Sequence, residues 1–388
     1  MADSNRLHSI NTSRILRAIW LNPGVSRIQA AELLDLDRST VTKIMQVILD
    51  RGLVVTAGKS TEQSGVGRRQ VQLRIREDLG VVIGLELQAA RCSGVITTLE
   101  GSVLHSFESP GAADAGNLAE RIVSVIALAR KWIDGEGLFL LGIGIGLPGV
   151  IDPYTGTVIR SHSFGLGAPR RLKDELEPLI PEPIFFENDA NCCCWAELAF
   201  ACDNRSRNFI SVLGEFRTDR PNETQCHGFA LGTGIVIRER VLHGDHFTAG
   251  EFRTVYSNPE TGQFEIPWRE LASLPENTSL LDTLYRELAE NLAFLVNCFD
   301  LTKIVFAGDL PEHRGNLASY VESAVADNWN YDISRELEIE FSRYGKAAVS
   351  IGAAGLFVEK LFSVPDIADR FQEMVGYDLY EYILKRKG

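Results

Sequence analysis

The chain has 388 residues, of which 45% are hydrophobic and 23% charged, so it holds enough apolar side chains for a folded core. No apolar run reaches the ~18 residues of a transmembrane helix, and the first residues lack the apolar stretch of a secretory signal. We therefore expect a cytoplasmic protein with no membrane partner. Its seven cysteines lack framework spacing, which favours reduced thiols over disulfides.

The net charge of −13 is distributed unevenly along the chain. Residues 1–78 carry 12 Lys and Arg against 8 Asp and Glu, whereas the remaining residues carry 27 against 44. Basic surfaces attract nucleic acids and acidic surfaces repel them. A small basic module joined to a large acidic body therefore indicates nucleic-acid binding by the module, unless the difference is local scatter.

Two short helices are predicted first. Residues 13–23 read as a helix that ends at Asn-Pro, and Ser26 is placed to cap a second helix. The predicted apolar face of that second helix comprises Ile28, Ala31, Leu33 and Leu34.

A third, amphipathic helix is predicted to end at Gly52. Its apolar residues recur at helical spacing, at Val41, Ile44, Met45, Ile48 and Leu49. Its first turns and opposite face carry short polar or cationic residues, namely Arg38, Ser39, Thr40, Thr42 and Lys43. A recognition helix needs such residues there, because its first turns meet base edges and phosphates in the major groove. These five residues are our candidate DNA contacts.

A β-hairpin is predicted next, because QVQLRIR at residues 70–76 alternates apolar and polar residues. The preceding tip, SGVGRRQ, places Arg68 and Arg69 beside two glycines, which suits a phosphate or minor-groove contact. Three helices and a basic hairpin predict a winged helix-turn-helix DNA-binding domain over residues 1–78. The alternative is a three-helix module used for protein contacts.

From residue 79 the sequence shows two groups of short strands, each followed by helices. The first group comprises VVIGLEL, CSGVITTL, SVLHSFES, LFLLGIGIG and IFFEND, and the second comprises FISVLGE, GFALGTGIVI, ERVLHG and KIVFAGDL. Helices are predicted at 116–134 and 279–299. The pattern indicates α/β lobes at 79–200 and 201–351, with residues 352–388 returning to the first lobe. Since ligands bind at strand ends in such folds, we expect GLPG, END and LGTG to line one cleft.

Six segments of the body occur in a characteristic order: GLPGVIDPYTG, FFENDAN, LGTGI, TAGEF, VFAG and SIGAAG. In that order and spacing, essentially the whole chain resembles the ROK family of sugar kinases and sugar-responsive repressors. The resemblance implies a two-lobed, actin-like and hexokinase-like ATPase-type α/β fold. The repressor branch of the family carries an N-terminal winged helix, as this chain is predicted to do.

The resemblance also implies a sugar site. Family kinases use the Asp of an Asn-Asp pair as general base on a sugar hydroxyl, and Asn188 and Asp189 match that pair. In a repressor the same side chains would hydrogen-bond sugar hydroxyls without chemistry. The other candidate contacts that the resemblance implies are Glu251, Glu270, Gly149 and His162. The alternatives are a helix N-cap role for Asp189 and a solvated turn for Glu251.

Both phosphate-binding turns of the family are altered. Glycine turns let backbone N–H groups approach phosphate oxygens. The first turn, Asp-x-Gly-Gly-Thr in the family, here has Glu86 followed by Gln88-Ala89-Ala90. The second, Gly-Thr-Gly-x-Gly-Gly in the family, continues from 232–234 into Ile-Val-Ile. We therefore expect no ATP cofactor and no catalytic residue, with Asp189 as the base only if the chain is a kinase after all.

The zinc-binding element of the family is also altered. Arg253 and Thr254 stand at its Gly-His positions, and no cysteine lies between Cys226 and Cys298. Because a structural zinc site needs four Cys or His ligands, we expect no bound metal ion. Phe252, Phe264 and Trp268 could hold this loop by packing instead. His227, His243 and His246 are interpreted as surface or packing residues.

Three consecutive cysteines, Cys192–Cys194, follow the Asn-Asp pair at the start of a predicted helix. Successive residues point about 100° apart around a helix, so these thiols cannot converge on one metal. We interpret them as small buried residues that allow close packing. Because a helix N-terminus can lower a thiol pKa, mild redox sensitivity stays open.

The sequence as a whole predicts a DNA-binding transcriptional regulator, a repressor of carbohydrate metabolism genes, that binds a sugar or sugar-derived effector without phosphorylating it. The expected partners are a pseudo-palindromic double-stranded DNA operator and a second copy of the chain, in a homodimer or homotetramer. Two alternatives stay open: an active ROK-type sugar kinase with a DNA-binding domain, and an effector-blind constitutive regulator.

Overall fold

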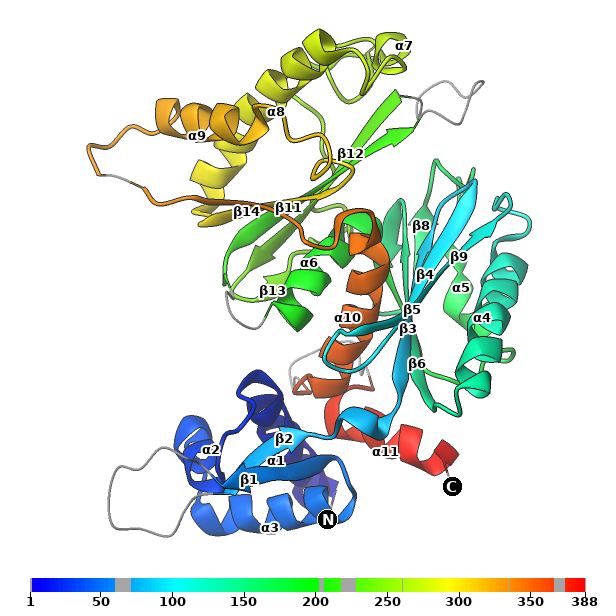
Figure 1. Cartoon of the computed structure of the whole chain (residues 1–388), viewed down its shortest axis with the longest axis vertical. Coiled ribbons are helices and arrows are strands. Elements are labelled where there is room, and N and C mark those ends of the chain that lie inside the picture. Colours follow the sequence, from blue (N-terminus) through cyan, green and yellow to red (C-terminus); the bar gives the residue numbers. More distant parts are fainter. Residues whose placement is uncertain are drawn as a thin grey trace.

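A computed structural model describes residues 2–59, 71–201, 206–217, 228–259, 261–333, 335–365 and 374–387. Figure 1 shows a small N-terminal domain beneath two larger lobes, with the C-terminal helix beside the small domain. Among the described residues, the helices are all too short or too polar to cross a bilayer.

The described part of the N-terminal domain contains three helices and a two-stranded antiparallel hairpin. These elements are α1 (Ala2–Leu21), α2 (Arg27–Leu34), α3 (Arg38–Asp50), β1 (Val54–Lys59) and β2 (Val71–Ile75). Ser26 caps α2 in a reciprocal capping box with Gln29, and Asp37 caps α3 by accepting from the N–H groups of Ser39 and Thr40. The apolar face predicted for the third helix is buried at Val41, Ile44, Met45 and Ile48.

Two details of this domain differ from the sequence interpretation. Helix α1 begins at Ala2 rather than at residue 13, because its N-terminal half packs against α11 (Gly376–Lys387), where the Ser9 hydroxyl donates to Asp378. The apolar face assigned to α2 is wrong at two positions. Ile28 and Leu33 are exposed, because α2 turns its alanines, Ala30 and Ala31, toward the core of the domain.

The two lobes repeat one sheet topology. The first sheet has the order β10-β6-β3-β4-β5, and the second has β15-β14-β11-β12-β13. In each sheet the first three strands along the chain pair antiparallel, and the fourth and fifth lie parallel to the first. The first sheet comprises β3 (Val81–Leu87), β4 (Arg91–Thr97), β5 (Val103–Pro110), β6 (Leu140–Leu147) and β10 (Ile184–Asn188). The second comprises β11 (Phe209–Arg217), β12 (Gly228–Ile237), β13 (Arg240–Val241), β14 (Lys303–Gly308) and β15 (Glu338–Phe341).

Helices cover both faces of each lobe's sheet region. In the first lobe, α4 (Leu118–Gly135) and α5 (Leu172–Leu176) pack on one face, and α10 (Ala348–Phe362) packs on the other beside α6 (Asp189–Phe200). The C-terminal part of the chain thus contacts the first lobe through α10. The second lobe carries α7 (Trp268–Leu271), α8 (Thr278–Phe299) and α9 (Leu317–Asp327). A small sheet of β7 (Val150–Asp152), β8 (Thr157–Arg160) and β9 (Arg170–Arg171) extends the first lobe.

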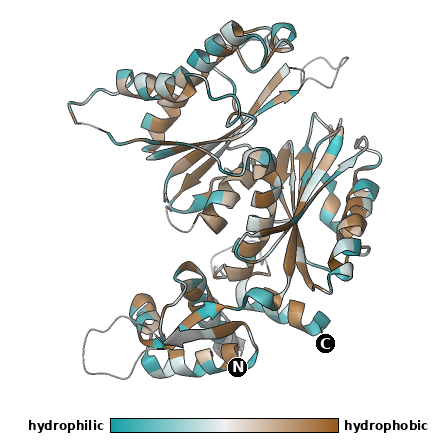
Figure 2. Cartoon of the chain, in the orientation of Figure 1, coloured by the Kyte–Doolittle hydropathy of each residue, from teal (hydrophilic) through white to brown (hydrophobic). Residues whose placement is uncertain are grey.

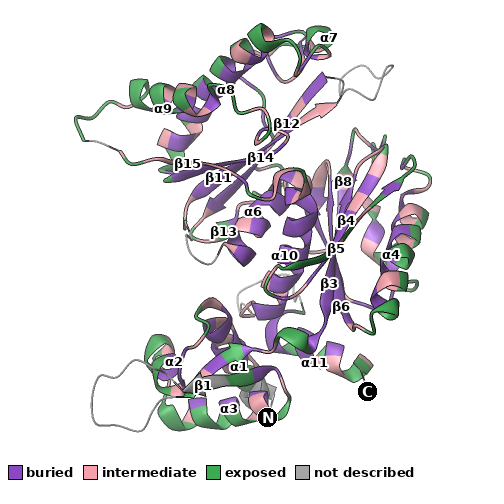
Figure 3. Ribbon diagram, viewed as in Figure 1, coloured by how far each residue is buried: buried purple, intermediate pink, exposed green. Residues whose placement is uncertain are grey.

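Helix α10 is buried along most of its length (Figure 3) and is among the most apolar segments of the chain (Figure 2). Glycines let backbones meet around it. A Cβ built on Gly352 would lie 1.7 Å from the Cys192 carbonyl oxygen, and one on Gly144 of β6 would lie 1.8 Å from the Ala353 carbonyl oxygen. Helix α10 therefore touches α6 and the first sheet with almost no side chain between them.

Cys192, Cys193 and Cys194 are buried in this α6 contact region, which confirms their interpretation as small packing residues. The redox sensitivity left open for them is contradicted, because burial raises the pKa of all three thiols above the ordinary value. The thiolate that oxidation requires is thus disfavoured.

Replacement of Gly352 by alanine should destabilise the protein, because the new methyl group would meet backbone atoms that cannot move independently. We expect the free energy of unfolding to fall by about 1–3 kcal/mol, measured by chemical denaturation. Gly135, at the end of α4, has open space around it and is the matched control. G135A should leave stability unchanged or slightly raised, and an equal loss in both variants would contradict the packing argument.

Candidate ligand-binding site

The junction of β10 and α6 forms one wall of the candidate site. The side-chain oxygen of Asn188 accepts from the Asn191 backbone N–H. The side-chain NH₂ group of Asn188 donates to the Gly149 carbonyl at 3.0 Å. Asn188 is therefore the N-cap of α6, and the alternative that Asp189 caps this helix is wrong. Asp189 is the first helical residue, and its carboxylate accepts from the adjacent Ala190 N–H.

Asp189 faces charged residues of the second lobe. Burial raises its pKa to about 6, and the nearby carboxylates of Glu215 and Glu251 act in the same direction, whereas Arg217 opposes them. The Asp189 carboxyl thus titrates close to neutral pH. Such a group can accept hydrogen bonds from the hydroxyls of a neutral ligand once it is ionised.

The charges of Glu251 and His162, which belong to different lobes, influence each other. Glu251 is exposed overall, but partial desolvation of its carboxyl raises its pKa, and the positive charge that His162 can carry lowers it. Glu251 is fixed through its neighbour, because the Gly250 carbonyl accepts from the Thr233 hydroxyl of β12 at 2.8 Å. Of the predicted ligand contacts, Asn188, Asp189, Gly149, Glu251 and His162 thus lie around one region.

Glu270 is placed elsewhere by the fold. It lies on the exposed side of the short helix α7, and its described contacts do not involve Asp189 or Glu251. Gly149 is required by the backbone, because its φ is +126° and a Cβ there would lie 2.3 Å from the Arg160 carbonyl oxygen.

Polar residues that sequence reasoning did not single out as ligand contacts occupy the altered first phosphate turn. The Gln88 side-chain amide donates to Glu86 at 2.7 Å and to Glu215 of the other lobe at 2.6 Å. The Ser93 hydroxyl donates to Glu86 at 2.8 Å. Burial and the charge of Glu215 raise the pKa of Glu86 well above its ordinary value. The turn is filled by carboxyl groups and their hydrogen bonds.

The second altered turn is not a turn in this structure. Gly232, Thr233 and Gly234 lie inside β12 and pair with residues of β11, so the expectation that LGTG ends a strand is wrong. A Cβ on Gly234 would lie 2.5 Å from the Cys194 sulfur. These glycines are therefore needed for the close approach of α6 to β12.

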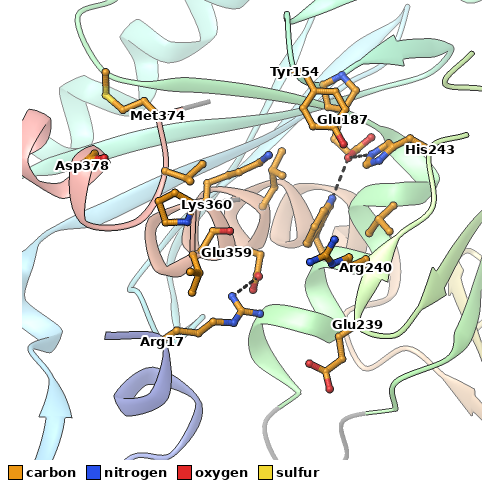
Figure 4. Close-up of a pocket in the computed structure, with 18 of the residues that line it drawn as sticks. Arg17, Tyr154, Glu187, Glu239, Arg240, His243, Glu359, Lys360, Met374 and Asp378 are labelled. Atoms are coloured by element: carbon orange, nitrogen blue, oxygen red, sulfur yellow. Dashed lines mark hydrogen bonds and ion pairs between the residues drawn. The ribbon is translucent and has the colours of Figure 1, made fainter. Parts of the chain in front are cut away.

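Glu187 and His243 form a buried ion pair at 2.8 Å, beside a cavity of about 1100 Å³ (Figure 4). Arg17 of α1 and Lys360 of α10 also line this cavity. The ring of His243 is thus held inside the protein by a carboxylate of another lobe, a partner that its interpretation as a surface or packing residue did not include. Nothing local in the sequence links the two residues.

Five of the seven predicted DNA contacts lie on α3. Arg38, Ser39, Thr42 and Lys43 are exposed on α3, and Thr40 is half-buried. The hydroxyls of Ser39 and Thr42 donate to Asp37 and to the Arg38 carbonyl, respectively. Arg68 and Arg69 lie outside the described residues.

The loop after Glu251 is held by polar and apolar contacts. The Gln263 side-chain amide donates to the carbonyls of Leu231 and Phe252 at 2.7 and 3.1 Å. Phe252 and Phe264 are buried, and Trp268 is half-buried. In the part of the chain that the structure describes, no three His, Cys, Asp or Glu side chains are arranged to hold a metal ion.

Comparisons with known proteins identify sequences similar to this chain. Residues 82–263 match the model of the ROK family. The xylose repressor of Bacillus subtilis (strain 168) is 25% identical over 391 residues, which cover 92% of this chain and 97% of the relative.

Two solved structures share the fold. A ROK family transcriptional regulator, described as a homologue of the E. coli Mlc protein, aligns with a TM-score of 0.73 and 20% identity over 98% of this chain and 99% of its own. A ROK family glucokinase from Streptomyces griseus aligns with a TM-score of 0.55 and 21% identity over 71% of this chain and 99% of its own. The first covers both the N-terminal domain and the body, which confirms the predicted fold.

Replacement of Asp189 by asparagine should stabilise the unliganded protein at alkaline pH. The folded chain holds the Asp189 proton up to about pH 6, whereas an unfolded carboxyl loses it near 3.8, so wild-type stability falls as pH rises through this range. The asparagine variant avoids this loss. We expect its melting temperature to exceed that of wild type at pH 8 and to match it near pH 4. Replacement of the exposed Glu322 of α9 by glutamine is the control, and a similar pH-dependent gain there would contradict the assignment.

Proposed function

We propose that the chain is a sugar-responsive transcriptional repressor that binds DNA in the cytoplasm. The proposal rests on a segment that matches the ROK family and on the winged helix-turn-helix that precedes it in the chain. The observation that carries the proposal is the full-length correspondence to regulators of this family, N-terminal domain included. The relatives named xylose repressors suggest an aldose as the effector.

The surface of α3 supports DNA binding. Its apolar face is buried against the rest of its domain, and the opposite face exposes Arg38, Thr42 and Lys43. A helix in the major groove uses such side chains for phosphate and base contacts. Since one winged helix reads one half-site, a homodimer or homotetramer on a pseudo-palindromic operator fits this geometry best.

The polar filling of the first phosphate turn supports binding without phosphorylation. ATP phosphates bind where backbone N–H groups or cations converge. Here Gln88 joins Glu86 to Glu215 across the lobes, and Glu215 has a neighbour of opposite charge in Arg217. A triphosphate would meet carboxyl groups in place of free N–H donors. The Asn188–Asp189–Glu251 region keeps its polar groups, which favours an effector-binding body over an effector-blind one.

Operator binding by α3 is the first test. Replacement of Lys43 by alanine should weaken binding to a fragment of the gene's own upstream region, because a phosphate contact is lost. The slope of log affinity against log salt concentration should fall in magnitude by about 1, because one fewer counterion is released. Fluorescence anisotropy at several salt concentrations measures both. The exposed Lys131 of α4 is the matched control, and K131A should bind as wild type does. A wild-type chain that finds no specific site in that region would count against the repressor.

Sugar binding without turnover is the second test. D-xylose and D-glucose should be compared for their effect on the melting temperature, because a ligand of the native state raises it. At least one should raise it in wild type and in E322Q but not in D189N. A coupled assay should detect no ADP formation with ATP and either sugar. Sugar-dependent ADP formation that D189N abolishes would instead support the kinase alternative.

A further inference from the structure

Glu187 is a fully buried carboxylate with a complete set of donors. It lies at the end of β10 and is 0% exposed. One oxygen accepts from the Asn188 N–H at 2.9 Å and from the Asn191 amide at 3.1 Å. The other accepts from the Trp195 ring N–H at 3.1 Å and lies 2.8 Å from Nε2 of His243. Three donors belong to the Glu187 segment itself, and the fourth comes from the loop that follows β13.

The contacts of the pair favour the charged forms of both residues. Burial alone would raise the pKa of Glu187, but the charge of His243 and hydrogen bonds from His243, Trp195 and Asn188 hold it below the ordinary value. Burial likewise disfavours the imidazolium, yet Glu187 raises the pKa of His243 above its ordinary value. Of the other charged groups around His243, Lys360 of α10 opposes this rise and Asp152 of β7 supports it. Arg240 of β13 and Glu359 of α10 line the same cavity.

This pair connects the two walls of the ligand site. Asn188 and Asp189 follow Glu187 directly at the start of α6. His243 begins the loop that ends at Glu251, and its carbonyl accepts from the Ala249 N–H at 3.1 Å, which closes that loop. The ion pair of Glu187 and His243 joins these two segments (Figure 4). The distance between Asp189 and Glu251 therefore depends on this ion pair.

We propose that Glu187 and His243 are positioning residues of the sugar site, whose ion pair holds the Asn188–Asp189 wall and the Glu251 wall at the spacing that binds the effector. Neither side chain needs to touch the sugar. The inference rests on the proposed function, because it takes this region as the effector site.

The pair also makes the site dependent on pH. The contribution of Glu187 is present above its ordinary value of 4.5 and is lost as pH falls through its lowered pKa. The contribution of His243 is present below its ordinary value of 6.5 and is lost as pH rises through its raised pKa. The Glu187–His243 ion pair is therefore intact between pH 4.5 and pH 6.5, the ordinary pKa values of the two groups, and it weakens at alkaline pH. Asp189 itself ionises near pH 6. The pH dependence caused by the ion pair is therefore distinguished from that caused by Asp189 by comparing variants.

The experiment compares E187Q, H243N and the control H246N, which removes an exposed histidine from the same loop. Isothermal titration with D-xylose and with D-glucose measures affinity at pH 6, and circular dichroism checks the fold. We expect E187Q and H243N to bind the active sugar about tenfold or more weakly than wild type, because each leaves one buried partner unpaired. H246N should bind as wild type does.

A histidine titration by NMR with ¹³C-labelled imidazole is the second measurement, which remains informative through the wild-type value if E187Q fails to fold. The His243 signal, assigned by its loss in H243N, should titrate above 6.5 in wild type and at a lower pH in E187Q. A wild-type value at or below 6.5 overturns the ion pair. Equal sugar affinity in E187Q, H243N and H246N overturns the positioning role. If neither sugar binds wild type, the effector part of the proposed function fails, and the positioning role with it.

Discussion

The contact of α10 with α6 and the first sheet is the constraint on which the other parts of the molecule depend. At Gly352 and Gly144 backbone meets backbone, so neither helix can shift along the other without a clash. Helix α10 also contacts α1 and α11, and its last turns line the cavity beside α1. One buried helix thus touches the N-terminal domain, the first lobe and α6, whose start forms one wall of the candidate ligand site.

This packing fixes the position of the residues at the candidate ligand site. Because α6 is held close to both sheets by small residues, its N-terminus lies at a defined place between the lobes, and Asn188 can cap it while holding Gly149. Asp189 then faces Glu215, Arg217 and Glu251 across the lobes. The same close packing requires glycine within β12, so the Gly-Thr-Gly segment serves the contact with α6 in this chain.

The electrostatics of the candidate site are dominated by buried carboxyl groups. Carboxyl groups fill the altered first phosphate turn, and burial raises the pKa of Glu86 and of Asp189. Deeper in the fold, the pKa of Glu187 is lowered because His243 and three further donors surround it. Carboxyl groups in one small region thus differ in the direction of their pKa shifts because their partners differ.

The sequence by itself determined the order and type of the main elements, the Ser26 cap of the second helix, the buried apolar face of the third helix, the Asn188–Asp189 junction and the burial of the three cysteines. These features follow from hydrophobic periodicity and capping residues within a few positions of each other, so they can be read locally. The short sheet at 150–171, α9 and β15 carry weak local signals and were not predicted. The start of α1 and the buried face of α2 depend on distant partners.

Only the tertiary structure decided which polar residues meet. His243 lies 56 positions from Glu187, and Glu215 lies 127 positions from Gln88. Periodicity cannot predict such pairs, because a charged residue after a strand has the same local pattern whether it faces solvent or a partner. The strand position of the Gly-Thr-Gly segment depends in the same way on distant partners, because β12 pairs with β11 and contacts α6.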